Sequence, residues 1–213
     1  TAFAPENSIF ARVVSKCVLF GMYLPLPATT ETHRGLVVGL AQSSDEIESI
    51  QRLRYDVFSS EYGAVLGDSQ DGIDRDAFDP WCEHLMVKEL GTDQIVGTYR
   101  ILTPYQAKRA GGYYSESEFD LSGLGQIRNQ LVEFGRACIH EDYRQGSALM
   151  MLWSGLAKIL KQGRYEHVFG CASVSLRDDG NTAARVWRQV RDEVGLVDQP
   201  KVTPVNRYPF ELL

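Results

Sequence analysis

The chain has 213 residues, of which 44% are hydrophobic and 23% are charged, a composition typical of one soluble globular domain. Its formal net charge of −6 argues against a protein that binds nucleic acid through a basic surface. No apolar run approaches the roughly 20 residues that a membrane-spanning helix needs. The longest apolar run, residues 13–26, is interrupted by Lys16, Gly21 and Pro25.

The four cysteines are far apart and include no Cys-x-x-Cys pair, which argues against a zinc site and a dense disulfide framework. Cys138 and Cys171 lie in apolar, strand-like runs, so we expect inert core thiols. His33, His140 and His167 lack the spacing of metal ligands, and we predict no metal site. Unpaired cysteines indicate a reducing, cytoplasmic location.

The N-terminal segment is strongly apolar, and we predict a helical arm over residues 9–24. It is either an arm that packs on the body or an element that contacts a membrane surface or a partner. The proline-rich stretch that follows, residues 25–30, resembles a linker. We therefore divide the chain into an arm with its linker, 1–30, and one domain, 31–213.

A short strand is expected over 36–41, and Ser43 with Glu46 forms a capping box that begins a helix. This helix carries apolar residues at helical spacing: Ile47, Ile50, Leu53, Val57 and Phe58. Arg54 lies on the same apolar side. Either its charged end reaches the solvent, or it makes a buried contact with an anion.

Residues 62–81 are irregular and acidic, and they do not match a calcium-binding loop. A hairpin follows, with strands over 84–90 and 95–102. His84 begins the first strand, and Arg100 interrupts the apolar pattern of the second. A short helix over 104–110 then leads into a long polar loop, and loops of that length are often functional.

The most informative segment is 131–139, which we predict to be a strand with Glu133 and Arg136 on opposite faces. Neither charge belongs in an ordinary buried strand, because a buried charge without a partner costs several kcal/mol. A turn through Gly146 then opens a helix over 147–162. A glycine turn before a helix can expose backbone N–H groups to a phosphate. The segment therefore indicates a transferase that holds a phosphate-bearing carrier next to a carboxylate.

A further strand over 165–174 and a last helix over 182–194 complete the chain. The order of elements predicts a mixed α/β sheet with a central hairpin and a terminal βαβα unit.

This order is that of the Gcn5-related N-acetyltransferase (GNAT) fold, and six motifs in one order narrow the resemblance: Arg54–Phe58, Asp76–Leu85, Gly97–Arg100, Tyr114–Asp120, Val132–Arg136 and Phe169–Ser173. Together they resemble the L-ornithine Nα-acyltransferases over residues 36–180. A weaker resemblance extends to N-acyl amino acid synthases and to acyl-homoserine lactone synthases. The positions that match their shared scheme are Arg54, Asp76, Asp79, Arg100, Glu133 and Arg136.

The resemblance implies an enzyme that moves a 3-hydroxyacyl group from acyl carrier protein to the α-amine of ornithine, which makes lyso-ornithine lipid. An acceptor such as Tyr, Gly or Lys remains open, as does a non-catalytic module that binds lipid or a partner. No permanently bound cofactor is implied, only a phosphopantetheine-linked acyl thioester as co-substrate. Such an enzyme would be cytoplasmic, or at the inner face of the membrane.

The loop before the helix over 147–162 is expected to hold the carrier. It has one spacer residue fewer than the usual acetyl-coenzyme A signature. We assign Arg144, Gly146 and Ser147 to phosphopantetheine. The shortened loop fits acyl carrier protein better than coenzyme A, since the carrier protein presents only phosphopantetheine and an acidic surface. Basic residues that suit such a partner gather in the last third: Lys158, Lys161, Arg164, Arg177, Arg185, Arg188 and Arg191.

Acyl transfer to an ammonium needs a base, and a positioned one contributes roughly 10²–10⁴-fold. We choose Glu133, which we expect to share a face with the small residues Gly135 and Ala137; the alternative is a structural pair with Arg100. His84 is the rival base, since its ordinary pKa suits the task.

Three arginines and two aspartates complete the predicted substrate site. Arg54, Arg100 and Arg136 either bind a substrate carboxylate or organise the loop after the first helix. Asp76 and Asp79 either pair with those arginines or hold a cationic amino acid.

Overall fold

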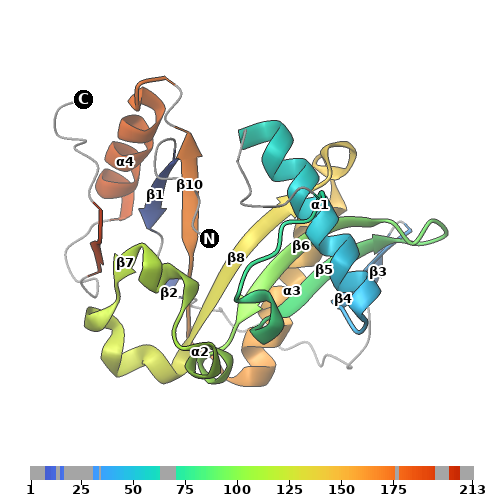
Figure 1. Ribbon diagram of the computed structural model, residues 1–213, viewed down its shortest axis with the longest axis horizontal. Helices are drawn as coiled ribbons and strands as arrows, with labels where there is room; N and C mark the ends of the chain where they lie inside the picture. Colours follow the sequence, from blue (N-terminus) through green and yellow to red (C-terminus); the bar gives the residue numbers. More distant parts are fainter. Residues whose placement is uncertain are drawn as a thin grey trace.

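The computed structural model describes residues 8–12, 15–16, 31–33, 35–62, 71–175, 178–194 and 202–206 (Figure 1). Its main sheet has seven strands in the order β2-β9-β8-β6-β5-β4-β3. Neighbouring strands are antiparallel except β8 and β9, which run parallel. In chain order these strands are β2 (Ser15–Lys16), β3 (Glu31–His33), β4 (Leu36–Leu40), β5 (Glu83–Glu89), β6 (Ile95–Leu102), β8 (Leu131–Ile139) and β9 (His167–Phe169). The mixed α/β sheet predicted from the sequence is confirmed.

Helices cover both faces of this sheet (Figure 1). The α-helices are α1 (Ser44–Tyr62), α2 (Pro104–Ala110), α3 (Ser147–Gly163) and α4 (Asn181–Val194). Short 3-10 helices occur at η1 (Asp79–Trp81), η2 (Tyr114–Ser117), η3 (Ser122–Gln130) and η4 (Glu141–Tyr143). Two small sheets stand apart from the main one, β1 (Ser8–Arg12) with β10 (Cys171–Ser175), and β7 (Phe119–Asp120) with β11 (Thr203–Pro204).

Each face of the main sheet has its own apolar core. On one face α3 buries Leu152, Leu156 and Leu160 against β4, β5 and β6. On the other face α1 buries Ile50 and Leu53 against the sheet. Further along that second face, a separate cluster lies beneath α2, η2 and η3. The polar residues described below lie on the second face, between its two apolar clusters.

The predicted start of α1 is confirmed with one change of partner. The N–H of Glu46 donates to the hydroxyl of Ser43 at 3.2 Å, as a capping box requires. The Glu46 carboxylate, however, accepts from the N–H of Gln42 at 2.8 Å rather than from that of Ser43. The cap still orients α1 across the sheet.

The helical arm predicted over residues 9–24 is wrong for the part that the structure describes. Ser8–Arg12 and Ser15–Lys16 are extended, and they pair with β10 and β9. Both partners would otherwise leave a backbone edge unpaired, so strand addition satisfies those N–H and C=O groups. Residues 13–14 and 17–30 lie outside the described residues. Among the residues that are described, none of the helices is long and apolar enough to cross a membrane.

The single strand predicted over 165–174 is two strands, separated at Gly170. β9 pairs with β8, whereas β10 leaves the main sheet and pairs with β1. Figure 1 shows β8 and β10 diverging from this point. A Cβ on Gly170 would lie 2.1 Å from the carbonyl oxygen of Phe134, so no side chain fits where the chain passes β8. Beyond Glu133, none of the described strands pairs with that side of β8.

The other edge of β8 contains a β-bulge. Arg100 of β6 lies opposite Gly135, but Thr98 lies opposite Cys138, so β8 has one extra residue between these pairs. Arg136 occupies the bulge with a φ of +49°, in the left-handed region that few residues other than glycine adopt.

The bulge changes which side chains share a face of the sheet. In a regular strand the side chains of Glu133, Gly135 and Ala137 would lie on one face of the sheet. Because of the bulge, Cys138 rather than Ala137 follows Gly135 on this face, where it packs beneath α1. Arg136 is turned toward Glu133's face, where both residues contact Tyr114. The predictions that Glu133 and Arg136 lie on opposite faces and that Ala137 shares the face of Glu133 are therefore wrong.

Replacing Gly170 by alanine should destabilise the fold by at least about 1–3 kcal/mol, the usual cost of overpacking, because the Phe134 carbonyl cannot move as a side chain would. Urea unfolding of the Gly170→Ala variant measures this. Gly39→Ala in β4 is the matched control, since its added Cβ meets nothing within 4 Å. Equal stability of the two variants would contradict the close approach of β9 and β8.

Candidate active site

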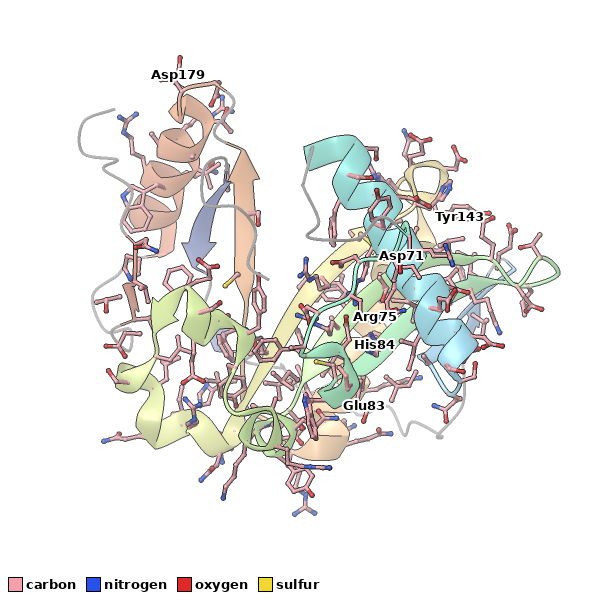
Figure 2. The ribbon with its side chains drawn as sticks, viewed as in Figure 1. Asp71, Arg75, Glu83, His84, Tyr143 and Asp179 are labelled. Atoms are coloured by element: carbon pink, nitrogen blue, oxygen red, sulfur yellow. The ribbon has the colours of Figure 1, made fainter. Side chains whose placement is uncertain are left out.

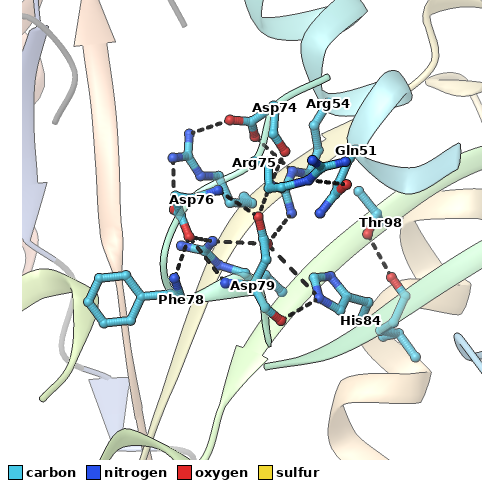
Figure 3. Close-up of polar contacts among 12 residues, drawn as sticks. Gln51, Arg54, Asp74, Arg75, Asp76, Phe78, Asp79, His84 and Thr98 are labelled. Atoms are coloured by element: carbon cyan, nitrogen blue, oxygen red, sulfur yellow. Dashed lines mark hydrogen bonds and ion pairs between the residues drawn. The ribbon is translucent and has the colours of Figure 1, made fainter. Parts of the chain in front are cut away.

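The centre of the site is Arg54, whose side chain has no exposed surface. Its Nε donates to Asp74 Oδ2 at 2.7 Å, and its Nη1 and Nη2 donate to the two carboxylate oxygens of Asp79 at 2.9 and 3.0 Å (Figure 3). The guanidinium thus joins α1 to two positions in the acidic segment that follows it. Of the two interpretations that the sequence left open, the buried contact with anions is the one observed.

A second layer of ion pairs extends from Arg54 to the sheet. Arg100 of β6 donates through Nη1 to Asp76 Oδ1 at 2.7 Å and to Asp79 Oδ1 at 3.1 Å. Arg136, from the bulge in β8, donates to Asp76 Oδ2 at 3.1 Å. Asp76 also accepts the N–H of Phe78 at 2.8 Å, which fixes the turn before η1. The acidic segment is therefore held to three elements at once.

The charges in this cluster balance, with three guanidiniums against the three carboxylates of Asp74, Asp76 and Asp79. Burial alone would raise the pKa of Asp79, but the hydrogen bonds and charge of Arg54 hold that pKa well below its ordinary value. The pKa of Asp76 is lowered in the same way, against burial, by the charge of Arg100. Asp76 and Asp79 therefore stay ionised at neutral pH.

His84 lies beside this cluster at the start of β5, with only 2% of its surface exposed (Figure 2). Its Nε2 is 3.2 Å from the carbonyl oxygen of Asp79, which can only accept, so Nε2 carries the proton. Its Nδ1 is buried without a hydrogen-bond partner. Burial lowers the pKa of His84, so the imidazole is neutral at pH 7.

Glu133 lies on the same face but makes a different set of contacts. One carboxylate oxygen accepts the N–H of Tyr114 at 2.8 Å; the other accepts the N–H of Ser115 at 2.8 Å and also the Ser115 hydroxyl. The predicted alternative, a direct pair with Arg100, is not among the contacts of Glu133. Burial raises the pKa of Glu133 above its ordinary value, although the donors from Ser115 and Tyr114 oppose this.

Tyr114 connects Glu133 to the ion-pair cluster. The guanidinium carbons of Arg100 and Arg136 lie 5.6 and 5.7 Å from the centre of its ring, within the range of cation–π attraction. The ring also meets Phe78 edge to face, with 5.7 Å between ring centres. The position of Glu133 therefore depends on the same loop that the arginines hold.

The face of β8 is open at Gly135, near Glu133. His84, Arg100 and Gly135 form one row across β5, β6 and β8, since each lies opposite the next. A Cβ on Gly135 would meet nothing within 4 Å, so this end of the row is open. Glu133 is two residues earlier on the same strand, so its side chain lies on the same face of the sheet as this open position.

The residues assigned to phosphopantetheine lie at the far end of β8. Arg144 donates through Nε and Nη2 to the carbonyl oxygen of Ile139 at 3.1 and 3.2 Å. Gly146 is the N-cap residue of α3 and supplies no side-chain cap, and Ser147 is the first residue of the helix. The N-terminus of α3 therefore has backbone N–H groups that no cap side chain satisfies.

The structure thus brings together seven predicted residues, which are Arg54, Asp76, Asp79, His84, Arg100, Glu133 and Arg136, and it places Arg144, Gly146 and Ser147 apart from them. Sequence reasoning missed Asp74 and Ser115, as well as the role of Tyr114 in contacting the arginines. It also expected an inert core thiol at Cys171, which is only partly buried and lies 3.1 Å from the Ser115 hydroxyl. The signals for Ser115 and Cys171 were their places in the Tyr114–Asp120 and Phe169–Ser173 motifs, whereas Asp74 was marked only as one acidic residue of the segment 62–81.

Replacing Arg54 by methionine should lower the free energy of unfolding by about 3–5 kcal/mol, because Asp74 and Asp79 lose the buried partner of their charges. Arg52→Met is the matched control, two residues earlier on α1. Its Arg52 side chain is half exposed and pairs with Glu48, so we expect at most about 0.5 kcal/mol. Chemical denaturation of both variants measures the difference, and equal losses would contradict the central role of Arg54.

The chain is similar in sequence to several known proteins. The family described as the acetyltransferase (GNAT) domain matches residues 53–154. The L-ornithine Nα-acyltransferase of Rhodobacter capsulatus is 38% identical over 143 residues, which cover 64% of this chain and 55% of that protein. The enzyme of the same name from Brucella abortus is 37% identical over 147 residues, covering 65% and 52%. The chain spans about half the length of the curated relatives it matches.

A more distant likeness is found to the solved structure of BjaI, a CoA-dependent acyl-homoserine lactone synthase with SAM and isopentyl-CoA. Its TM-score is 0.46 at 15% identity, and the match covers 73% of this chain and 85% of that one. Residues 53–154 thus match the GNAT acetyltransferase domain, and the resemblance of the chain to the L-ornithine Nα-acyltransferases predicted from its sequence is confirmed.

Proposed function

We propose that this protein is an N-acyltransferase that moves a 3-hydroxyacyl group from a thioester to the α-amine of ornithine, forming lyso-ornithine lipid. The observation that carries the proposal is Glu133, a buried carboxylate with a raised pKa beside the open space at Gly135. The names of the relatives supply the acceptor, ornithine.

Glu133 is the proposed general base. A carboxylate has about four lone-pair positions, and Tyr114 and Ser115 occupy three of those of Glu133. One position on Oε2 is left to take a proton from the ammonium of the substrate. The raised pKa of Glu133 suits a base, since a carboxyl group closer to neutral accepts a proton more readily.

His84 is the weaker candidate for the base, and we assign it a positioning role. Arg100 lies between His84 and the open end of the row at Gly135. The Nε2–H of His84 donates to the backbone carbonyl of Asp79, and the carboxylate of Asp79 accepts from Arg54 and Arg100. His84 would therefore act on the reaction through the loop rather than on the substrate.

Most of the predicted substrate contacts are used within the protein. Arg54 and Asp79 are fully engaged with each other and with Asp74 or Arg100, which supports the role of organising the loop. Asp76 and Arg136 are the more exposed end of the cluster, with side-chain exposures of 9% and 10%. These two are the charged groups that a substrate ammonium or carboxylate would reach first.

The proposed acyl donor is acyl carrier protein. Its phosphate would lie at the uncapped N-terminus of α3, where backbone N–H groups and the helix dipole favour an anion. Ile139 is four positions after Gly135 on β8, a distance of about 13 Å that an extended phosphopantetheine arm would follow. The basic residues suited to an acidic partner lie on two elements, with Lys158, Lys161 and Arg164 at the end of α3 and Arg185 and Arg188 on α4.

Replacing Glu133 by glutamine should lower kcat by roughly 10²–10⁴-fold, because no base then takes the proton of the ammonium. In the parent enzyme kcat should fall as the pH drops through the raised pKa of Glu133, since only the ionised carboxylate is active. Glu118→Gln, in the same loop, is the control and should retain both the rate and the acidic limb. An acidic limb that persists in Glu133→Gln would show that another group is the base.

Incubation of the protein with 3-hydroxyacyl carrier protein and a pool of all amino acids should give acyl-ornithine, detected by mass spectrometry. A different acylated amino acid would retain the reaction and change the acceptor. Stable binding of the carrier protein without any acylated product would contradict an enzyme and favour a binding module.

A further inference from the structure

Glu133 is connected by hydrogen bonds to a thiol on another strand. The Ser115 hydroxyl has one proton, and an ionised carboxylate only accepts, so that proton is donated to Glu133. The oxygen of Ser115 is then left to accept from Cys171, whose Sγ lies 3.1 Å away. The three groups form a continuous chain, Cys171 S–H to Ser115 O–H to the Glu133 carboxylate.

Each group of this chain comes from a different element. Glu133 belongs to β8, Ser115 to η2 and Cys171 is the first residue of β10. Gly170, the residue before Cys171, is in contact with the Phe134 carbonyl of β8. The Cα atom of Cys171 is therefore about 3.8 Å from that of Gly170, the residue at which the chain leaves β8.

The location of Cys171 suits a contact with the leaving group of the proposed reaction. Cys171 is partly exposed, whereas Cys138, under α1, is buried. The thioester in our proposed function lies beside Gly135, next to Phe134, on the side of β8 that no described strand covers beyond Glu133. Burial raises the pKa of Cys171 to about 12, so the thiol keeps its proton at neutral pH. A thiol of this kind is a poor nucleophile but remains a proton carrier.

We propose that Cys171, Ser115 and Glu133 form a proton relay that returns to the departing thiolate the proton that Glu133 takes from the ammonium. This inference rests on the proposed N-acyltransferase function, and it adds Cys171 as a catalytic residue and Ser115 as the link between it and the base.

The relay balances the reaction. Glu133 takes one proton from the ammonium; the nitrogen then forms its bond to the thioester carbon, and the carbon–sulfur bond breaks with its electron pair on sulfur. The thiolate takes the proton of Cys171, and Cys171 takes that of Ser115. Ser115 takes the one held by Glu133 after the carboxyl group turns and brings its protonated oxygen to the Ser115 hydroxyl. The nitrogen gives up its second proton to the solvent. An ammonium and a thioester thus become an amide, a thiol and one free proton, and all three groups return to their starting state.

The test uses two acyl donors whose leaving thiolates differ in basicity, and therefore in their need for a proton. One is the N-acetylcysteamine thioester, which ends as phosphopantetheine does; the other is the 4-nitrothiophenol thioester, whose leaving thiolate is stable without a proton. Ornithine is the acceptor for both. We expect Cys171→Ala to lower kcat with the first donor by about 10–100-fold, within the range of acid–base catalysis, and with the second by less than about 2-fold.

Three variants make the result specific. Cys171→Ser keeps a proton donor and should restore much of the rate with the N-acetylcysteamine donor. Ser115→Ala breaks the link and should lower that rate at least as much as Cys171→Ala. Cys82→Ala is the matched control, since Cys82 is also partly buried and its pKa is likewise raised to about 12, but its thiol lies outside the relay. It should leave the ratio of the two rates unchanged.

The outcomes separate this inference from the proposed function. Equal losses with both donors in Cys171→Ala would overturn the relay and leave the acyltransferase intact. An acyl adduct on Cys171 in the intact mass of the parent enzyme would also overturn it, because the thiol would then be a nucleophile. A folded parent enzyme that acylates nothing from either donor would refute the proposed function and the relay with it.

Discussion

The site depends first on the burial of one guanidinium. Arg54 has no contact with solvent, so it requires anionic partners, and it takes them from a segment 20 to 25 residues further along the chain. Those partners bring Asp76 to the sheet, where it meets Arg100 and Arg136. The two arginines lie against Tyr114, and the backbone of Tyr114 and Ser115 holds Glu133. A continuous series of polar contacts thus leads from α1 to the proposed base.

Two ways of burying a carboxylate occur side by side on this face. The aspartates are neutralised by arginines, which lowers the pKa of Asp76 and Asp79 against the effect of burial. Glu133 is the additional negative charge, and it is held by two amides and a hydroxyl, none of which carries a full charge. Burial therefore raises the pKa of Glu133, and these donors and the charge of Arg100 oppose that rise only in part. This difference in partners keeps the aspartates ionised while Glu133 remains able to exchange a proton.

Much of the fold follows from local patterns in the sequence. The helical spacing of Ile50, Leu53 and Val57 predicts the buried side of α1, and the alternation in 84–90 and 95–102 predicts the hairpin. The charged residues of the cluster could be predicted because an arginine or a glutamate within an apolar pattern needs a partner. Which of them pair with one another could not, since Arg54 meets Asp74 only after the chain has folded back.

The errors have a common physical origin in contacts between distant segments. Gly170 reads as one position in a continuous apolar strand, and only its approach to the Phe134 carbonyl shows why the strand divides there. Ser8–Arg12 becomes a strand because β10 offers a partner, which its own sequence does not reveal. Cys171 looked inert because its run is apolar, yet the hydroxyl that it contacts is 56 residues away.

The bulge at Arg136 shows how an irregularity in the sheet makes such a site. In a regular strand Arg136 would point to the opposite face from Glu133, where α3 packs Leu152 and Leu156 against the sheet. A charge in that apolar core would have no partner and would cost several kcal/mol. The extra residue in β8 instead turns the guanidinium toward Asp76, at the cost of a left-handed backbone conformation. The strain at Arg136 is thus smaller than the penalty it avoids, and the bulge places Glu133, Gly135 and Arg136 on one face of the sheet.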